Sequence, residues 1–255
     1  MSATLDSLID QLVAARRERR TVDATPFEPV IRNADDAYVV QAALANEFDW
    51  FGEGVPANWK SGGPSRTATL GHSALPPAGV WRSPATLGDW PFALGGIEAE
   101  VPVRVGDDVD ADRAAHLDVD SAPELIDAMT VSIELVDSRW TQGFKAPSLL
   151  RLADLQLHAA LVLGDWVPYV RRDWSAQRCR VTLGNRGTSE FTGSHALGDP
   201  AWVLPEWLRH ATSEGRVVPA GTVVTTGTWC GLLIAQPGEL VSVEFDGIGQ
   251  ASVQV

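Results

Sequence analysis

The chain has 255 residues, of which 45% are hydrophobic and 21% charged, and its formal net charge is −13. This length and composition suit one large globular domain, or one domain with a helical extension, that buries a sizeable core. The negative charge repels nucleic-acid backbones and anionic membranes, and the sequence has no run of 18 apolar residues. We therefore expect neither a nucleic acid nor a membrane as a partner. The only two cysteines, Cys179 and Cys230, predict a protein of the reducing cytoplasm rather than a disulfide scaffold.

The first 55 residues have the pattern of a helical region. Apolar residues recur at helical spacing within 4–20, at Leu5, Leu8, Ile9, Leu12 and Val13. The segment ends in Arg-Arg-Glu-Arg-Arg, and cations at the carboxyl end of a helix interact favourably with its dipole. A second amphipathic segment runs from Asn33 to about Phe48. The sequence therefore predicts a pair of N-terminal helices.

From about residue 56 the chain changes to short β-like runs separated by glycine and proline. We expect strands at 56–63, 97–105, 129–136, 160–170, 179–183, 222–227, 231–235, 240–245 and 248–255. Helical segments are expected at 121–128, at about 146–158 and at 202–214. The pattern predicts an α+β fold in which an N-terminal helical region, 1–55, packs on a β-rich catalytic domain, 56–255.

The segment 95–105, Gly-Gly-Ile-Glu-Ala-Glu-Val-Pro-Val-Arg-Val, contains two glutamates spaced for one face of a strand. Glu98 and Glu100 point together in such a strand, while Ile97 and Ala99 point to the other side. Two carboxylates this close repel each other unless a cation lies between them. Oxygen ligands with no histidine or cysteine nearby favour Mg²⁺, Mn²⁺ or Ca²⁺ over Zn²⁺. The alternative is a solvated strand face with two ordinary surface glutamates.

A second carboxylate segment lies at 131–139, Val-Ser-Ile-Glu-Leu-Val-Asp-Ser-Arg. Glu134 interrupts an apolar strand there, and a carboxylate buried in such a run has to be paired, metal-bound or neutral. Asp137, Ser138 and Arg139 close the strand. The alternative for this end is an Asp-Ser turn with a salt-bridged arginine.

Together these segments resemble the fumarylacetoacetate hydrolase superfamily, and more closely its 2-keto-4-pentenoate hydratase and 4-oxalocrotonate decarboxylase branch. Glu-Ala-Glu is followed about 35 residues later by Glu-Leu-Val-Asp-Ser-Arg. Further similar segments lie in order along the chain, at Trp-Lys-Ser-Gly (59–62), at 152–164, at 207–228, which ends in Thr-Gly-Thr, and at Gly-Ile-Gly (247–249). The resemblance implies a mixed β-roll core with flanking helices and an N-terminal helical region packed against it.

The resemblance also implies a functional site. It implies a Mg²⁺ or Mn²⁺ ion held by Glu98, Glu100 and Glu134, with Asp137 as the reserve third ligand. It places Lys60 against a metal-chelated 2-oxo acid, and the turn of Thr226, Gly227 and Thr228 against the substrate carboxylate. The expected activity is that of a hydratase or decarboxylase, a lyase of aromatic catabolism, that works through a metal-stabilised enolate. The expected assembly is a homo-oligomer, or a complex with a related pathway enzyme.

The five histidines show neither of the spacings His-x-His and His-Glu-x-x-His, so a histidine metal site is not expected. His158 lies in an apolar stretch and is interpreted as a core residue. His195 lies in a loop where the family has glycines near the substrate, which makes it a second candidate catalytic residue beside Lys60. Lys60 could stabilise charge or move a proton, and its alternative is a lysine in solvent.

Two segments depart from the branch. Residues 61–75 lack its usual continuation, and Leu150, Leu155 and Leu157 stand where the branch carries polar residues. The part of the site that binds the substrate is therefore expected to be more apolar than is usual in the branch. Two other functions stay open, namely a C–C hydrolase of acylpyruvates or an oxaloacetate tautomerase or decarboxylase, and a catalytically reduced binding or subunit protein of the same fold. No His-Glu pair typical of the hydrolases is found in the sequence.

Overall fold

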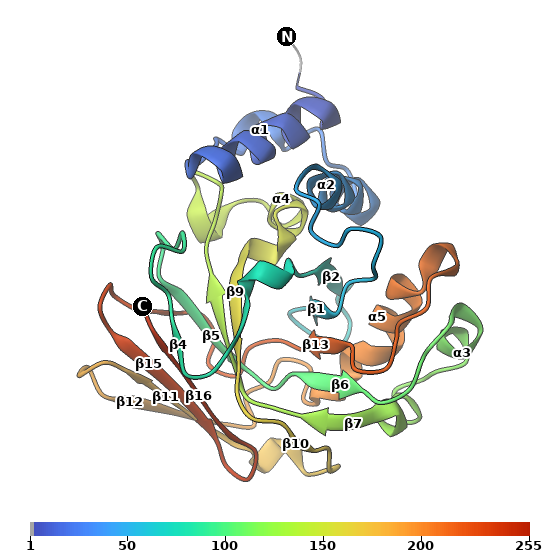
Figure 1. Cartoon of the computed structure of the whole chain (residues 1–255), viewed down its shortest axis with the longest axis vertical. Coiled ribbons are helices and arrows are strands. Elements are labelled where there is room, and N and C mark those ends of the chain that lie inside the picture. The colour runs from blue at the N-terminus through green and yellow to red at the C-terminus, as the bar shows by residue number, and fades with distance from the viewer. Residues whose placement is uncertain (1–2) are drawn as a thin grey trace.

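Two helices at the N-terminus cover one end of a β-rich body (Figure 1). In this computed structural model, which describes residues 3–255, the helices are α1 (Leu5–Glu18) and α2 (Ala34–Glu47). Thr4 caps α1 by accepting from the Ser7 backbone N–H, and Asn33 caps α2 by accepting from the Asp36 backbone N–H. Such side-chain caps satisfy backbone donors that a helix start leaves unpaired.

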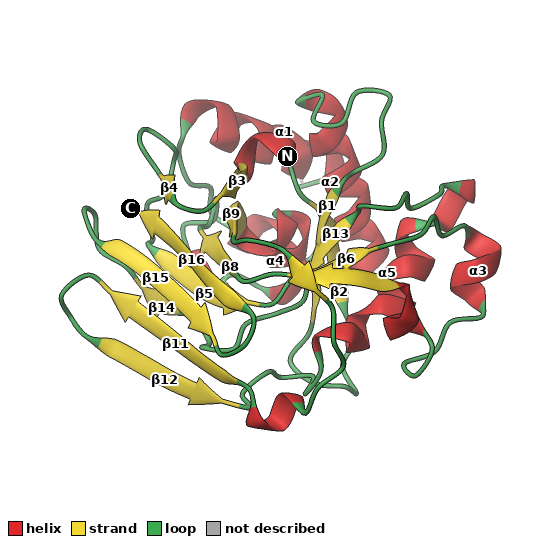
Figure 2. Ribbon diagram, turned by 60° about the horizontal axis from the view of Figure 1, so that its bottom comes forward, coloured by secondary structure: helices red, strands yellow, loops and turns green. Residues whose placement is uncertain are grey.

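Three sheets make up the β-rich body (Figure 2). The six-stranded sheet has the order β10 (Val167–Pro168), β7 (Ile126–Met129), β6 (Val103–Val105), β13 (Val223–Thr225), β1 (Asn58–Gly62) and β2 (Gly71–Ala74). The second sheet has the order β14 (Leu233–Ile234), β5 (Gly96–Glu100), β8 (Ser132–Val136), β9 (His158–Leu163) and β3 (Val80–Arg82). The third has the order β12 (Thr188–Thr192), β11 (Arg178–Leu183), β15 (Leu240–Phe245), β16 (Gly249–Gln254) and β4 (Ala85–Thr86).

Three chain segments pass from one sheet into the next by bending. The predicted strand 97–105 divides at Val101–Pro102 into β5 and β6, and Pro102 has no backbone N–H to continue the ladder. The predicted strand 160–170 divides into β9 and β10, and the predicted strand 129–136 corresponds to β8, which β7 precedes across a similar bend. The bends keep the two sheets continuous, since β5, β8 and β9 pair in one sheet while β6, β7 and β10 lie in order in the other.

The remaining helices are short and flank the sheets. They are α3 (Ala111–Ala115), α4 (Ser148–Ala153) and α5 (Leu204–Ala211). In Figure 1, α4 lies beneath the N-terminal pair, and α3 and α5 lie together on the far side of the six-stranded sheet. None of the helices within residues 3–255 has the length and apolar character needed to cross a membrane.

The observed elements correct several sequence-based expectations. The helix expected at 121–128 is only a 3₁₀ turn, Ala122–Leu125, followed by β7, because Asp127 points outward between buried Ile126 and Ala128 in strand alternation. The helix expected at 146–158 ends at Ala153 and is followed by three left-handed residues. The strands β2, β3, β4 and β12 and the helix α3 were not expected, because each is short and has little periodicity.

The N-terminal helices share a buried apolar cluster with the β-rich body. Leu8, Leu12 and Leu44 from the helices lie in one cluster with Trp140 and Leu150. A larger cluster fills the space between the sheets. The division at residue 55 stays a prediction, but the helices and the body are in contact through this common core.

A buried ion-pair network also ties α1 to the body. Asp154, which is fully buried, accepts from Arg139 Nε at 2.7 Å and from Arg16 Nη2 at 2.8 Å. Burial, with the charge of Arg139, lowers the pKa of Arg16 to about 10 in spite of the attraction of Asp154. One buried carboxylate thus pairs with two cations at the start of the turn that follows α4.

Candidate functional site

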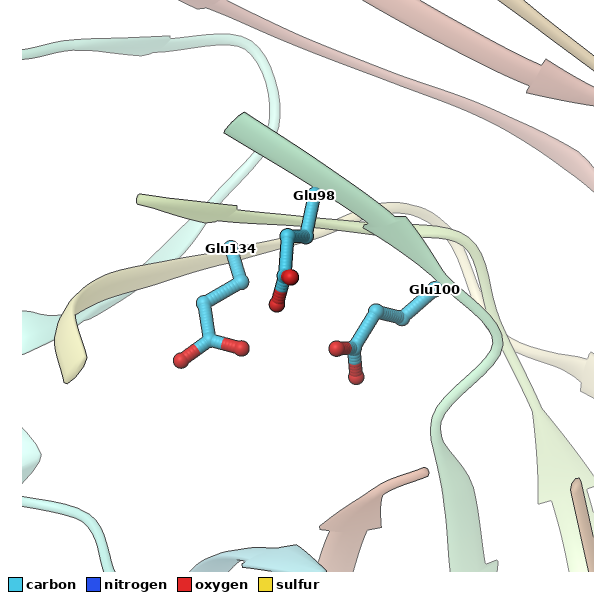
Figure 3. Close-up of side chains that lie close together, drawn as sticks. All are labelled: Glu98, Glu100 and Glu134. Atoms are coloured by element: carbon cyan, nitrogen blue, oxygen red, sulfur yellow. The ribbon is translucent and has the colours of Figure 1, made fainter. Parts of the chain in front are cut away.

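Glu98, Glu100 and Glu134 converge on one point because two neighbouring strands present them on the same face. In the antiparallel pair β5–β8, Glu98 lies directly opposite Glu134, and Glu100 lies opposite Ser132. Cross-strand neighbours on one face have their Cβ atoms about 5 Å apart. One carboxylate oxygen from each residue lies within 4.8 Å of the other two. Figure 3 shows the three side chains pointing into the same space.

Lys60 reaches this cluster from the six-stranded sheet. It lies on β1, and its Nζ is 2.7 Å from Glu134 Oε2 and 3.7 Å from Glu98 Oε2. The lysine is buried, with 8% of its surface exposed. Trp59 and Ser61 on either side of Lys60 alternate to the opposite face of the strand, where Trp59 packs on Trp207 of α5. The structure therefore brings the four predicted residues together from three strands.

Hydrogen bonds fix two of the three carboxylates. Glu100 Oε2 accepts from the Thr225 hydroxyl and from the Gly227 backbone N–H at 3.0 Å. Glu134 Oε1 lies 3.0 Å from His158 Nδ1. His158 is buried, as expected of a core residue, but it also holds a cluster carboxylate. Sequence reasoning missed Thr225 and this contact of His158, for which the only signals were the neighbouring Thr-Gly-Thr turn and the end of an apolar strand.

Burial and the neighbouring charges shift the pKa values of all four residues of the cluster. Burial, opposed by the charge of Lys60 and aided by that of Glu134, raises the pKa of Glu98 to about 7. Burial, followed by the charge of Glu134, raises the pKa of Glu100 to about 8. Burial opposes ionisation of Glu134, but Lys60 and His158 outweigh it and lower its pKa. Burial also lowers the pKa of Lys60, but the three carboxylates outweigh it and raise that pKa above its ordinary value.

A divalent cation fits this set of residues. Three carboxylates and one ammonium carry a charge of −2, which a divalent cation neutralises. Glu100 Oε1 is buried and has no hydrogen-bond partner among residues 3–255, and buried polar atoms without a partner are uncommon. The donors are all hard oxygens, which suit Mg²⁺ or Mn²⁺. Glu98, Glu100 and Glu134 are therefore the residues that would hold such an ion.

A cavity of about 740 Å³ opens from the carboxylate cluster. Lys60, Glu98, Glu100, His195 and the turn 226–228 all line it. Within the turn, the Thr226 hydroxyl donates to the Val101 carbonyl at 3.0 Å, and the Thr228 hydroxyl donates to the Gly231 carbonyl at 3.0 Å. The turn therefore faces the cavity while both of its hydroxyls are engaged with backbone carbonyls.

His195 contacts the same turn. Its Nε2 lies 2.9 Å from the Thr226 carbonyl oxygen, and because a carbonyl only accepts, Nε2 carries the proton. Nδ1 is then an acceptor, and it is buried with no partner among residues 3–255. Burial lowers the pKa of His195 to about 4 despite the hydrogen bond to Thr226. The side chain is thus a neutral imidazole with an unused acceptor at the edge of the cavity.

Asp137, the reserve ligand, lies outside the carboxylate cluster. Its Oδ2 accepts from the Ala93 N–H at 2.7 Å, and its Oδ1 accepts from the Leu94 N–H at 3.2 Å and the Ser138 N–H at 2.8 Å. These bonds hold the loop before β5. Asp137 therefore supports the strand that carries Glu98 and Glu100, and does not point to the cluster.

The fold is that of solved enzymes built on the same combination of N-terminal helices and mixed sheets. Over 98% of this chain and 96% of the other, it is similar to 4-oxalocrotonate decarboxylase from Pseudomonas putida G7 complexed with magnesium and adipate, with a TM-score of 0.82 and 19% identity. It is less similar to fumarylpyruvate hydrolase from Pseudomonas aeruginosa in complex with Mn²⁺ and pyruvate, with a TM-score of 0.55 and 14% identity over 79% of this chain and 90% of the other. The predicted α+β fold class is confirmed.

The chain belongs to the fumarylacetoacetate (FAA) hydrolase C-terminal family, whose model matches residues 82–255. Among curated proteins it is 26% identical to 2-keto-4-pentenoate hydratase 2 of Dechloromonas aromatica (strain RCB), over 98% of both chains. It is 25% identical to 4-oxalocrotonate decarboxylase of Pseudomonas sp over 50% of this chain and 49% of that protein. The resemblance predicted from the sequence is therefore confirmed.

Proposed function

We propose that this protein is a lyase, a hydratase or a decarboxylase, that depends on Mg²⁺ or Mn²⁺ and acts on a 2-oxo acid. The observation that carries the proposal is the convergence of Glu98, Glu100 and Glu134 beside Lys60, at a cavity that Lys60, Glu98 and Glu100 line. The hydratases and decarboxylases among its relatives, and a structure of the same fold with magnesium, support it. A divalent cation bound there supplies a Lewis acid that stabilises negative charge on the 2-oxo oxygen of the substrate.

The residues of the chain supply positioning and proton transfer in this proposal. Lys60, buried and charged, faces the reacting part of the substrate and stabilises or donates a proton to the charge that develops there. The turn 226–228 faces the substrate carboxylate, to which its hydroxyls would donate in exchange for the carbonyls of Val101 and Gly231. His195 accepts a proton or a hydrogen bond at Nδ1, while its bond to Thr226 fixes the tautomer.

Analysis of products tests the reaction class. The protein is incubated with Mg²⁺ or Mn²⁺ and a panel of 2-oxo acids that carry a conjugated alkene, a second carboxylate next to the reacting carbon, or an acyl group. We expect hydration or release of CO₂ that stops when a chelator is added and returns with metal. Cleavage of acylpyruvates would point to a C–C hydrolase instead, and absence of turnover with metal bound would point to a binding or subunit protein.

Replacement of His195 by glutamine is expected to lower kcat about 100-fold, the contribution typical of a general acid or base, with a smaller effect on KM. In the wild-type protein, protonation of Nδ1 removes the acceptor, so kcat should fall as the pH is lowered through about 4, the pKa of His195. The pH–rate profile of the variant should lack this limb. The matched control is His116→Gln, since His116 is exposed and does not line the cavity. Unchanged kcat in His195→Gln would contradict the assignment.

A further inference from the structure

The cavity is far larger than the head group of a 2-oxo acid requires. Its volume of about 740 Å³ is within the range of about 300–1,000 Å³ seen for sites of drug-sized ligands. Pyruvate fills only a small part of such a space. The rest of the cavity therefore has room for the remainder of a larger substrate.

The sheet that carries the carboxylates becomes apolar along the cavity. On the face where Glu98 pairs with Glu134, the next pair is Gly96 and Val136. Phe144 packs over that position, because a side-chain carbon on Gly96 would lie 3.0 Å from Phe144 Cζ. Val136 and Phe144 both line the cavity. On this side of the carboxylates, Val136 and Phe144 therefore present apolar surface to the cavity.

The segment 149–157 adds leucines to this wall. Leu149 and Leu152 of α4 line the cavity, as does Leu157. Residues 155–157 all have positive φ, with 64° at Leu157, a conformation that asparagine tolerates much better than leucine. The turn is held by its own contacts, with the Asp137 N–H donating to the Leu157 carbonyl at 2.9 Å. Leu157 thus adds apolar surface to the cavity although its left-handed backbone conformation is unfavourable for leucine.

Few cations line the cavity to pair with a second carboxylate. Among the described residues that line it, the lysine and arginine side chains are Lys60 and Arg151. Lys60 is already paired with Glu134 and Glu98, and Arg151 is exposed. The net charge of −13 also disfavours a substrate with an additional negative charge.

We propose that the cavity selects 2-oxo acids with an unbranched apolar tail over those that end in a second carboxylate. This inference rests on the proposed function, because it assumes that the head group binds beside the carboxylate cluster. Apolar surface that leaves water on binding to Val136, Phe144, Leu149, Leu152 and Leu157 should strengthen binding about fourfold for each added methylene.

Calorimetric titration with Mg²⁺ or Mn²⁺ and without either metal tests this selectivity. The ligands are pyruvate, 2-oxobutanoate, 2-oxopentanoate, 2-oxohexanoate and, as the dicarboxylate of equal length, 2-oxohexanedioate. We expect Kd to fall at each step to 2-oxohexanoate and to be higher for 2-oxohexanedioate. Equal affinities along the series, or tighter binding of the dicarboxylate that is lost in Arg151→Gln, would overturn the proposal.

Two variants locate the tail. Leu149→Arg places a cation in the half-buried part of the wall and should reverse the preference toward 2-oxohexanedioate, whereas Val39→Arg, at an exposed position outside the cavity, should not. Leu157→Asn suits the left-handed backbone and should weaken the dependence on tail length without adding charge. Unchanged selectivity in both cavity variants would show that the tail does not contact this wall.

The titration separates this proposal from the proposed function. Metal-dependent binding of pyruvate with no effect of tail length overturns only the tail selectivity. Tail-dependent binding that does not require Mg²⁺ or Mn²⁺ overturns the metal-dependent function and leaves the apolar site. Absence of binding by every 2-oxo acid overturns both.

Discussion

Replacement of Lys60 by methionine is expected to lower kcat by about 100-fold or more, the loss typical when a positioned acid or base is removed. Methionine has a similar length and no charge, so it fills the space without the ammonium group that lies 2.7 Å from Glu134 Oε2. Turnover is measured with saturating Mg²⁺ or Mn²⁺ on the substrate found in the product survey. The physical reason is that Lys60 is the buried cationic side chain that faces the cluster and lines the cavity.

Lys60→Arg separates charge from proton transfer. Arginine keeps a positive charge but does not release its proton at neutral pH. If Lys60 transfers a proton, both variants lose activity, whereas if it only stabilises charge, the arginine variant should keep a measurable part. Turnover of Lys60→Met within a few-fold of the wild-type rate, in a folded protein, would remove Lys60 from the mechanism.

Replacement of Asp154 by alanine is expected to lower the free energy of unfolding by about 3–5 kcal/mol, as removal of one partner from a buried ion pair commonly does. Asp154 is fully buried and accepts from both Arg139 and Arg16, so the change leaves two poorly solvated cations facing each other. Denaturation in urea measures the loss. Because Asp154 begins the turn that carries Leu157 to the cavity, the variant should also weaken substrate binding.

The matched control is Asp127→Ala. Asp127 pairs with Arg104 at 2.6 Å, but both side chains are partly exposed, and exposed pairs contribute about 0–1 kcal/mol. A loss of stability in Asp154→Ala no greater than in Asp127→Ala would contradict the role given to the buried network.

The sequence predicted the fold class and much of the chain's division into elements, because the informative patterns were local. The stripe from Leu5 to Val13 and the alternation around Glu98 each depend on a few neighbouring residues. The bends after Glu100 and Met129, by contrast, follow from how two sheets meet. A segment of strand-like residues such as 129–136 does not itself indicate where one sheet ends and the next begins.

The sequence predicted which side chains of the candidate site lie together. It did not predict the strand register and the hydrogen bonds that position them. The spacing of Glu98 and Glu100 gave a shared face, and the resemblance added Glu134 and Lys60. That Glu134 lies opposite Glu98 depends on strand register, which a single strand does not encode. The hydrogen bond from Thr225 to Glu100 joins residues 125 positions apart, so only the folded chain makes it visible.

The most direct test of the account is the melting temperature of the protein with Mg²⁺ or Mn²⁺, with oxalate, and with both, in the wild type and in Glu98→Ala/Glu100→Ala. Oxalate resembles the enolate of pyruvate, and a ligand at 100 times its Kd stabilises the folded state by about 2.7 kcal/mol. For a chain of this size that corresponds to a rise of about 5–10 °C. The account predicts a rise that needs both metal and oxalate in the wild type and is absent from the variant. No rise in the wild type at millimolar metal, or the same rise in the variant, would contradict it.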